Sequence, residues 1–340
     1  MARDPLLIFT PEGIHCPEGG FHIDPWRPVA RALITHGHAD HAREGHGAYL
    51  APHAAAPVLR HRLGDIRLGT LAYGEPREIG GVTVCFHPAG HVPGSAQIRV
   101  ARGGEVWVVS GDYKVAPDGL SEPFEPVECQ HFVTESTFGL PVFRWPDRDQ
   151  VAAELNGWWK DSLAAGRRPV LGAYALGKAL RLLTLLDPSI GPILTHGAVE
   201  ATNAALRAQG LSLPETVRVT PETDPDAYPG ALLLAPPSAL GSRWARHFGP
   251  SSNGFASGWM RLRGVRRRRA VDRGFVVSDH ADWAGLNWAI DQTKAENVYV
   301  THGYTENFTR WLCDKGLNAQ VVPTEFGGEV EDDAVTEAEA

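Results

Sequence analysis

The sequence predicts an α/β protein in which one α/β unit is inserted into another. Short strand-like runs broken by Gly and Pro fill residues 1–135, whereas helices and strands alternate over residues 147–250. Such alternation is typical of a parallel sheet. A strand–helix–strand–helix series closes the chain, with no internal repeat or long linker before it. We therefore expect this last series to complete the first domain.

The first 135 residues predict a β-rich region with one helix. Strands are expected where β-branched and aromatic residues gather between turn signals. The single helix is expected near residues 54–63. The predicted strands are 6–10, 32–35, 82–86, 97–100, 106–110 and 132–134.

The rest of the chain predicts helices from apolar residues at the 3.6-residue period. In residues 147–165, for example, Val151, Leu155 and Trp159 recur on one helical face. The further predicted helices are 178–186, 199–209, 283–293 and 305–313, and the predicted strands are 169–174, 193–195, 232–235, 275–278 and 298–301.

Composition indicates a soluble, cytoplasmic enzyme. A chain of 340 residues exceeds the size at which one core usually stops growing. Its 43% hydrophobic and 21% charged residues are ordinary for a globular protein. No apolar run reaches the roughly 18 residues of a membrane span, and residues 1–5 lack the apolar core of a signal peptide. No membrane partner is expected.

The cysteines and the net charge say less about function. Cys16, Cys85, Cys129 and Cys313 lie far apart without a CxxC pair, so we expect buried free thiols in a reducing compartment. The net charge of -8 does not predict nucleic-acid binding. Part of this charge lies in the acidic stretch 329–333, which we expect to be disordered.

The sequence THGHADHA (35–42) places three histidines and an aspartate within six positions, after the apolar run 32–34. Imidazole and carboxylate groups suit zinc and related divalent ions. On an extended backbone His36 and His38 point to the same side, and Asp40 and His41 follow past a bend, where they can serve a second metal. The alternative is a histidine-rich surface loop.

Two more ligand-type residues are expected where strands end. His91 lies in a loop bounded by Gly and Pro after the strand 82–86, and Asp112 lies just beyond the strand 106–110. Alone, a histidine in a turn is more often a hydrogen-bonded loop residue, and Gly-Asp is a common turn pair. Together with the residues of THGHADHA, they supply the further ligands that two metal ions would need.

These motifs resemble those of the metallo-β-lactamase fold. Along the chain, that fold carries an HxHxDH motif, then a ligand His and then a ligand Asp. The resemblance extends to the β-CASP branch of that fold, the nucleic-acid nucleases with an inserted cap domain. The segments similar to its motifs A, B and C are TESTFG (134–139), SDHAD (278–282) and VTHG (300–303). The segments similar to the bacterial ligase-associated DNA exonucleases are IDPWRP (23–28), YALGK (174–178) and ASGWM (256–260).

The resemblance implies a metallo-β-lactamase αββα sandwich with an inserted α/β β-CASP cap domain. Residues 1–145 would form the first part of the sandwich, 146–270 the cap, and 271–328 the completion of the sandwich. Residues 329–340 would form an acidic disordered tail.

The resemblance also implies two divalent metal ions, zinc and/or manganese. A hydroxide between them would attack the phosphate while the cations neutralise its developing charge. One ion would be held by His36, His38 and His91, the other by Asp40, His41 and His302, and both by Asp112.

The same resemblance implies catalytic roles for Asp40, Glu135 and His280. If Glu135 and His280 approach each other, they form a carboxylate-oriented imidazole near the leaving oxygen, which is a candidate general acid. The alternatives are a strand-end carboxylate that caps a turn and a satisfied core histidine.

Motif C and chain length favour different substrates. His302 is typical of the RNA-processing β-CASP enzymes, whereas the animal DNA crosslink-repair nucleases typically carry Val there. The RNA enzymes, however, usually add a C-terminal domain, and few residues follow the last predicted helix. We expect a DNA exonuclease that acts on free ends in end processing or repair, nucleoid-associated and functionally linked to a DNA ligase. An RNA nuclease with the same site is the alternative, followed by a non-nuclease metallohydrolase or a scaffold.

Local charge favours a polyanionic substrate. Seven arginines fall between residues 260 and 274, immediately before motif B, and among them Arg266, Arg267, Arg268 and Arg269 are candidate phosphate contacts. A solvated arm is the alternative. Lys178, at a predicted helix start, could bind a terminal phosphate beside backbone amides, or be an ordinary first-turn lysine.

Overall fold

The computed structural model describes residues 5–269, 271–322 and 324. The described chain is a mixed α/β protein with three sheets. It divides into two compact units: residues up to Val142 with those from His280 onward, and Phe143–Asp279. The predicted acidic tail, 329–340, lies outside the described residues. Within the described ranges, no helix is long and apolar enough to cross a membrane.

The first six strands form one sheet, in which each strand pairs with the next along the chain. β1, β2 and β3 pair antiparallel, whereas β3 to β6 run parallel. Helix α1 (Ala56–Leu63), preceded by the short helix η1 (His53–Ala55), packs on this sheet, because its Leu59 shares a buried cluster with Ala32 and Ile34. The strands are β1 (Ile8–Thr10), β2 (Gly13–Cys16), β3 (Phe21–Ile23), β4 (Ala32–Leu33), β5 (Tyr49–Pro52) and β6 (Leu68–Leu71).

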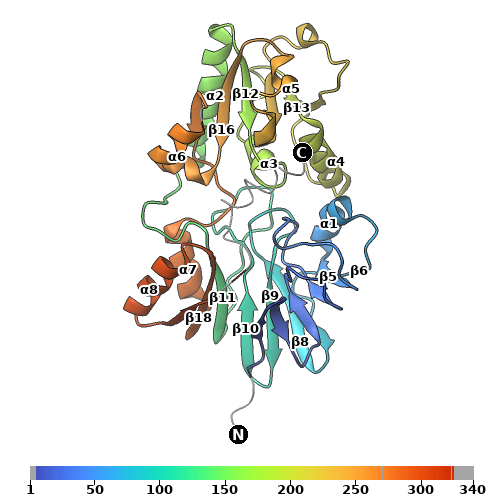
Figure 1. Cartoon of the computed structure of the whole chain (residues 1–340), viewed down its shortest axis with the longest axis vertical. Coiled ribbons are helices and arrows are strands. Elements are labelled where there is room, and N and C mark those ends of the chain that lie inside the picture. The colour runs from blue at the N-terminus through green and yellow to red at the C-terminus, as the bar shows by residue number, and fades with distance from the viewer. Residues whose placement is uncertain (1–4, 270, 323, 325–340) are drawn as a thin grey trace. The chain divides into compact units, whose positions relative to one another are not determined.

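The second sheet of this unit has seven strands in the order β19-β18-β11-β10-β9-β8-β7. β10, β11, β18 and β19 run parallel, so their carboxyl ends share one edge. Helices α7 (Trp283–Thr293) and α8 (Thr305–Asp314) cover one face, where Leu286 and Phe308 cluster with Phe132 (Figure 1). The strands are β7 (Arg77–Ile79), β8 (Val82–Pro88), β9 (Ala96–Arg102), β10 (Glu105–Val109), β11 (His131–Ser136), β18 (Asn297–Gly303) and β19 (Asn318–Val321).

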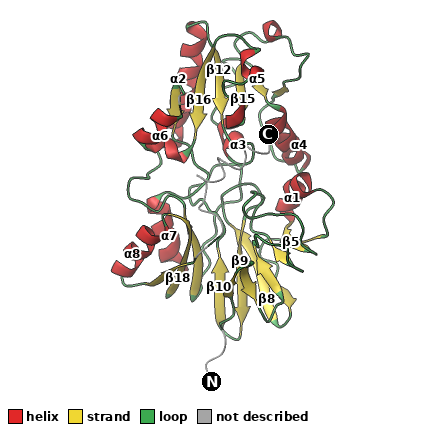
Figure 2. Cartoon of the chain, in the orientation of Figure 1, coloured by secondary structure: helices red, strands yellow, loops and turns green. Residues whose placement is uncertain are grey.

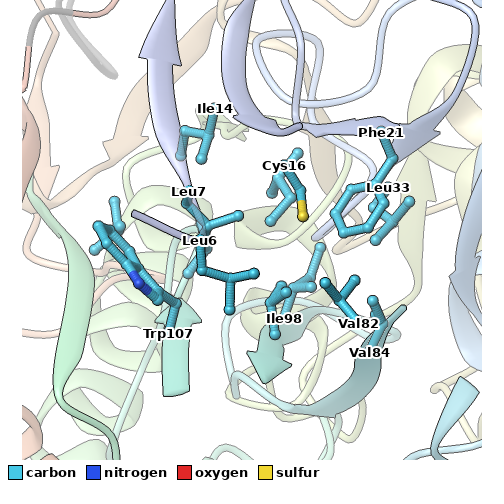
Figure 3. Packing of buried hydrophobic residues seen from close by; sticks show 14 of the residues in the cluster. Leu6, Leu7, Ile14, Cys16, Phe21, Leu33, Val82, Val84, Ile98 and Trp107 are labelled. Carbon is cyan, nitrogen blue, oxygen red and sulfur yellow. The ribbon is translucent and has the colours of Figure 1, made fainter. Parts of the chain in front are cut away.

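The two sheets of the first unit share a buried core. Figure 3 shows Cys16 and Phe21 of the first sheet facing Val84 and Ile98 of the second, with Trp107 at the side. All five are almost completely inaccessible to solvent. Burial of large apolar side chains between the sheets stabilises both, and thereby fixes the strand ends that carry the candidate site.

The second unit is built on a six-stranded sheet in which every pair of strands is parallel. Alternate residues of one strand enter different cores, since Leu171 packs with α2 while Val170 packs beside α5. Both faces are therefore covered, as is typical of a parallel sheet, and Figure 2 shows helices flanking the strands. The strands are β12 (Arg168–Gly172), β13 (Ile193–Thr195), β14 (Val217–Arg218), β15 (Leu232–Ala235), β16 (Ser251–Ala256) and β17 (Arg273–Phe275). The helices are α2 (Arg148–Ala164), α3 (Lys178–Leu183), α4 (Gly197–Ala208), α5 (Arg243–Arg246), α6 (Arg263–Arg268), η2 (Pro225–Ala227), η3 (Pro237–Ala239) and η4 (Gly258–Arg261).

The predicted parallel α/β region is confirmed, and some local predictions are wrong. The strand predicted at 275–278 is β17, which ends at Phe275 because its neighbour β16 ends at Ala256. The strand predicted at 32–35, which leads into the histidine-rich segment, is β4 and ends at Leu33. Cys313 is exposed near the end of α8, whereas the other three cysteines are buried as predicted, all as free thiols.

Candidate metal centre

The ligand-type residues of the first unit meet where strands end. His36 to His41 follow β4, His91 follows β8, and Asp112 follows β10. β4 ends at Leu33, so His36 lies outside the strand, and the chain turns beyond it, where the His41 and Ala42 N–H groups donate to the His38 carbonyl. This turn brings the His41 ring back to the His36 ring, with 4.1 Å between their centroids.

Four of these residues form a first group around one point. The Nε2 atoms of His36 and His91 lie 3.2 and 3.0 Å from His38 Nδ1. The same two Nε2 atoms lie 3.6 and 3.8 Å from Asp112 Oδ2. Three imidazoles and one carboxylate thus present one ligand atom each within 4.8 Å of one another.

A second group adjoins the first through Asp112. His41 Nε2 lies 3.3 Å from Asp40 Oδ2 and 3.4 Å from Asp112 Oδ2. His302 Nδ1 lies 3.9 Å from Asp112 Oδ1. A pocket lined by Asp24, Asp40, His41 and His302 borders this group. Asp112 therefore faces both groups, as a bridging carboxylate must.

Several ligand atoms of these two groups are arranged to bind cations rather than to hydrogen-bond with one another. Asp40 Oδ1, His41 Nε2 and Asp112 Oδ1 are buried without a hydrogen-bond partner in the described structure. Because His41 Nδ1 contacts Asp24, the Nε2 lone pair of a neutral His41 faces two carboxylates, an arrangement that repels unless a positive charge lies between them. The donor set of imidazole nitrogen and carboxylate oxygen suits zinc-like divalent ions.

The charges of the site follow from burial and proximity. Burial alone raises the pKa of a carboxyl, but the neighbouring histidines, His41 above all, hold the pKa of Asp40 and Asp112 below the usual range. Burial, with like charge on His41, lowers the pKa of His36 and His302. The pKa of His41 is instead raised well above its usual range, because the facing carboxylates of Asp40 and Asp112 outweigh its burial, so a metal ion would have to displace a proton there. Ionised carboxylates and neutral imidazoles are the forms that bind metals.

Glu135 and His280 approach each other, as motifs A and B imply. His280 Nδ1 lies 2.8 Å from Glu135 Oε2, and the Tyr113 N–H donates to Glu135 Oε1 at 2.8 Å. Both side chains are buried. The pair lies beside the first group, because the rings of His280 and His91 are 4.6 Å apart between centroids.

Asp24 is a site residue that our sequence analysis assigned no role. Its carboxylate contacts His41 Nδ1 at 2.8 Å and accepts hydrogen bonds from the Thr35 N–H at 2.8 Å and from the Thr35 hydroxyl. A φ of 41° turns the Asp24 backbone into the left-handed region. A carboxylate behind a ligand histidine fixes its tautomer and orientation. The signal in the sequence is its place in the segment IDPWRP (23–28), which resembles the ligase-associated exonucleases.

The predicted substrate-binding residues lie in the second unit. Lys178 begins α3 and is buried, with its Nζ 3.3 Å from Asp279 Oδ2. Arg266 donates to the Met260 carbonyl and Arg269 lies over the Phe255 ring, 4.8 Å from its centroid. Arg267 and Arg268 are exposed on α6. The segment is thus partly structural and partly open to solvent.

Known proteins with similar sequences include nucleic-acid enzymes, although no protein-family model matches the chain. A probable DNA ligase of Opitutus terrae is 28% identical over 313 residues, 91% of this chain and 30% of the relative. A ribonuclease of Thermus thermophilus is 29% identical over 211 residues, 54% of this chain and 46% of the relative. Cleavage and polyadenylation specificity factor 73 of Drosophila melanogaster is 27% identical over 123 residues, 36% of this chain and 18% of the relative.

The chain spans less than half the length of these curated relatives. Its fold resembles a solved structure of a protein of unknown function from Enterococcus faecalis, with a TM-score of 0.59 and 11% identity over 88% of this chain and 80% of the other.

Proposed function

We propose that this chain, a relative of the β-CASP branch of metallo-β-lactamase nucleases, is a metal-dependent phosphodiesterase that acts as a DNA exonuclease in end processing or repair. The observation that carries the proposal is two groups of mostly buried ligand-type residues that share Asp112, with the Glu135–His280 pair beside them. A site of this composition suits cleavage of a negatively charged phosphodiester.

Two divalent ions, zinc and/or manganese, would be held by the two groups. When bound, they would supply a nucleophilic hydroxide and neutralise charge on the phosphate. The proposed ligands are His36, His38, His91 and Asp112 for one ion, and Asp40, His41, His302 and Asp112 for the other.

His280 is the proposed general acid. With Nδ1–H donated to Glu135, the proton exchanged with the leaving oxygen would be carried on Nε2. Glu135 is occupied at both oxygens, by Tyr113 N–H and by His280. We therefore assign Glu135 the role of holding the tautomer and orientation of His280.

DNA is favoured by the match to a probable DNA ligase, which covers 91% of this chain. The same match supports a functional link to a ligase, and a DNA substrate implies association with the nucleoid. RNA is the second candidate, because His302 is typical of RNA-processing members and the relatives include a ribonuclease.

We further propose that the first unit is the αββα sandwich and that the second is the β-CASP cap. Sheets with helices packed on them support the former, and a parallel sheet covered on both faces supports the latter. On this assignment Lys178 and Arg266 to Arg269 belong to the cap, where we propose that the arginines contact the phosphates of the substrate. Lys178 would bind a terminal phosphate only by giving up its contact with Asp279.

The test is digestion of end-labelled single- and double-stranded DNA and RNA of matched sequence, and of a small phosphodiester, with zinc and manganese supplied in turn. Metal-dependent release of nucleotides from DNA ends is expected. Preferential cleavage of RNA would move the assignment to the second candidate. Hydrolysis of only a small phosphodiester would indicate a non-nuclease metallohydrolase, and no hydrolysis of any substrate would indicate a scaffold.

A further inference from the structure

We infer that two buried serines, Ser95 and Ser136, each position one histidine ligand and thereby set the affinity of the two metal positions separately. The inference rests on the proposed metal centre. His91 belongs only to the first group and His302 only to the second, while Asp112 is common to both. A residue that holds one of these histidines can therefore act on one position alone.

His302 enters the centre through a β-bulge. β11 and β18 pair Glu135 with Thr301 and then Ser136 with Gly303, so His302 is looped out of the ladder. Its φ is 50°, in the left-handed region that a side chain rarely adopts. Gly303 follows with a φ of 78°, and a Cβ there would lie 2.4 Å from Thr137 Cα. This backbone must be held by its surroundings.

Ser136 holds this bulge. Its side chain is completely buried, and its Oγ lies within hydrogen-bond distance of the carbonyl oxygens of His302 and Thr301, the latter at 3.3 Å. Its own carbonyl accepts a hydrogen bond from Tyr304 N–H at 3.0 Å. Contacts on both sides of His302 thus come from one residue, so removal of the hydroxyl releases the carbonyl of the ligand itself.

Ser95 holds His91 in a different way. Its buried Oγ accepts hydrogen bonds from the backbone N–H groups of His91 and Val92, at 3.1 and 3.2 Å. The loop closes on the same residue, because Ala89 N–H donates to the Ser95 carbonyl and Ser95 N–H to the Val92 carbonyl, at 3.1 and 2.9 Å. These contacts do not involve the bulge at His302.

The experiment measures zinc affinity of the full chain in competition with a chelator, for wild type, Ser95→Ala and Ser136→Ala. Wild type is expected to bind two ions. Each variant should keep one affinity and lose about 10- to 100-fold in the other, the usual effect of removing an outer partner of a ligand. Ser162→Ala is the control, since Ser162 is also buried but donates to the Trp158 carbonyl within α2.

A double-mutant cycle assigns the affected position. Ser136→Ala should add little to His302→Ala but should add its full effect to His91→Ala, and Ser95→Ala should show the opposite pattern. Equal losses at both positions, unchanged affinities, or additive effects in every combination would overturn the inference. Failure of wild type to bind any divalent ion would instead overturn the proposed centre.

Serine-to-cysteine variants keep the test decisive if an alanine variant does not fold. Cysteine is close to serine in shape but a weaker hydrogen-bond partner. Manganese is the probe for Ser95→Cys and Ser136→Cys, because thiols are poor ligands for that ion. A smaller loss confined to the same single position is expected, and a loss shared by both positions would contradict it.

Discussion

The candidate metal centre and the arginine-rich segment around α6 use charge in opposite ways. In the centre, Asp112 and His41 are buried and each contacts several fixed partners. On α6, Arg267 and Arg268 are exposed. Bond cleavage needs atoms held at fixed separations, whereas attraction of a phosphate backbone needs charge but little geometry. Substitutions in the two regions should therefore differ in kind as well as in size.

The largest effect is expected at Asp112. Asp112→Ala removes the one carboxylate that faces both groups, so cleavage should fall to the background rate and the count of tightly bound ions should drop. Turnover of labelled DNA and metal analysis of the purified variant check this. Asp291→Ala, at an exposed carboxylate of α7, is the matched control. Full activity of Asp112→Ala, or of exhaustively chelated wild type, would contradict the dinuclear mechanism.

A smaller but still large effect is expected at His280. If this residue protonates the leaving oxygen, His280→Ala should slow cleavage by about 10²-fold or more. The metal content should stay unchanged, because His280 contacts Glu135 rather than completing either proposed ligand set. Loss of metal in this variant would make His280 a ligand, and an unaltered rate would make it a core histidine.

How far sequence predicts such a site depends on how local the signal is. The segment THGHADHA carries four ligand-type residues in one short stretch, and the structure brings them together with His91 and Asp112. The parallel sheet of the second unit follows equally from a local pattern of alternating helices and strands. His302 carried no such signal of its own and was singled out through resemblance alone.

The remaining features depend on contacts between distant residues. Lys178 was predicted from its place at a helix start, but its ammonium is buried against Asp279, 101 residues away. In the sequence Asp24 looks like an ordinary turn aspartate, and its role follows only from its contact with His41 in the folded structure. The bulge at His302 needs Ser136 from another strand. Periodicity and turn chemistry contain no information on such pairs, because each partner alone has an ordinary local role.

Asp24 provides an intermediate test of the centre. Asp24→Ala removes the carboxylate behind His41, so the position held by Asp40, His41 and His302 should lose about 10- to 100-fold in metal affinity. The other position should change less. Zinc titration in competition with a chelator measures both affinities. Asp24→Asn, which can still accept from the Thr35 N–H, should lose less than Asp24→Ala. Equal affinities in all three proteins would reduce Asp24 to a turn residue.

The smallest effect on chemistry is expected in the arginine-rich segment. Replacing Arg266 to Arg269 by Ala should weaken DNA binding similarly for all sequences and flatten the dependence of log affinity on log salt by about one unit per lost phosphate contact. Hydrolysis of a small phosphodiester should be nearly unchanged, because the ligands of the other unit are untouched.

The structure sharpens this prediction within the segment. Arg266 is exposed but held by the Met260 carbonyl, and the half-buried Arg269 lies over the Phe255 ring. Most of the change in salt slope should therefore come from the exposed Arg267 and Arg268, whose side chains have more freedom to meet a phosphate. Arg267→Ala with Arg268→Ala is therefore expected to approach the fourfold variant, whereas Arg243→Ala with Arg246→Ala, on α5 of the same unit, serves as the control pair. An unaltered salt slope in both variants would make the segment a solvated arm. The phosphate contacts would then have to be sought elsewhere in the second unit.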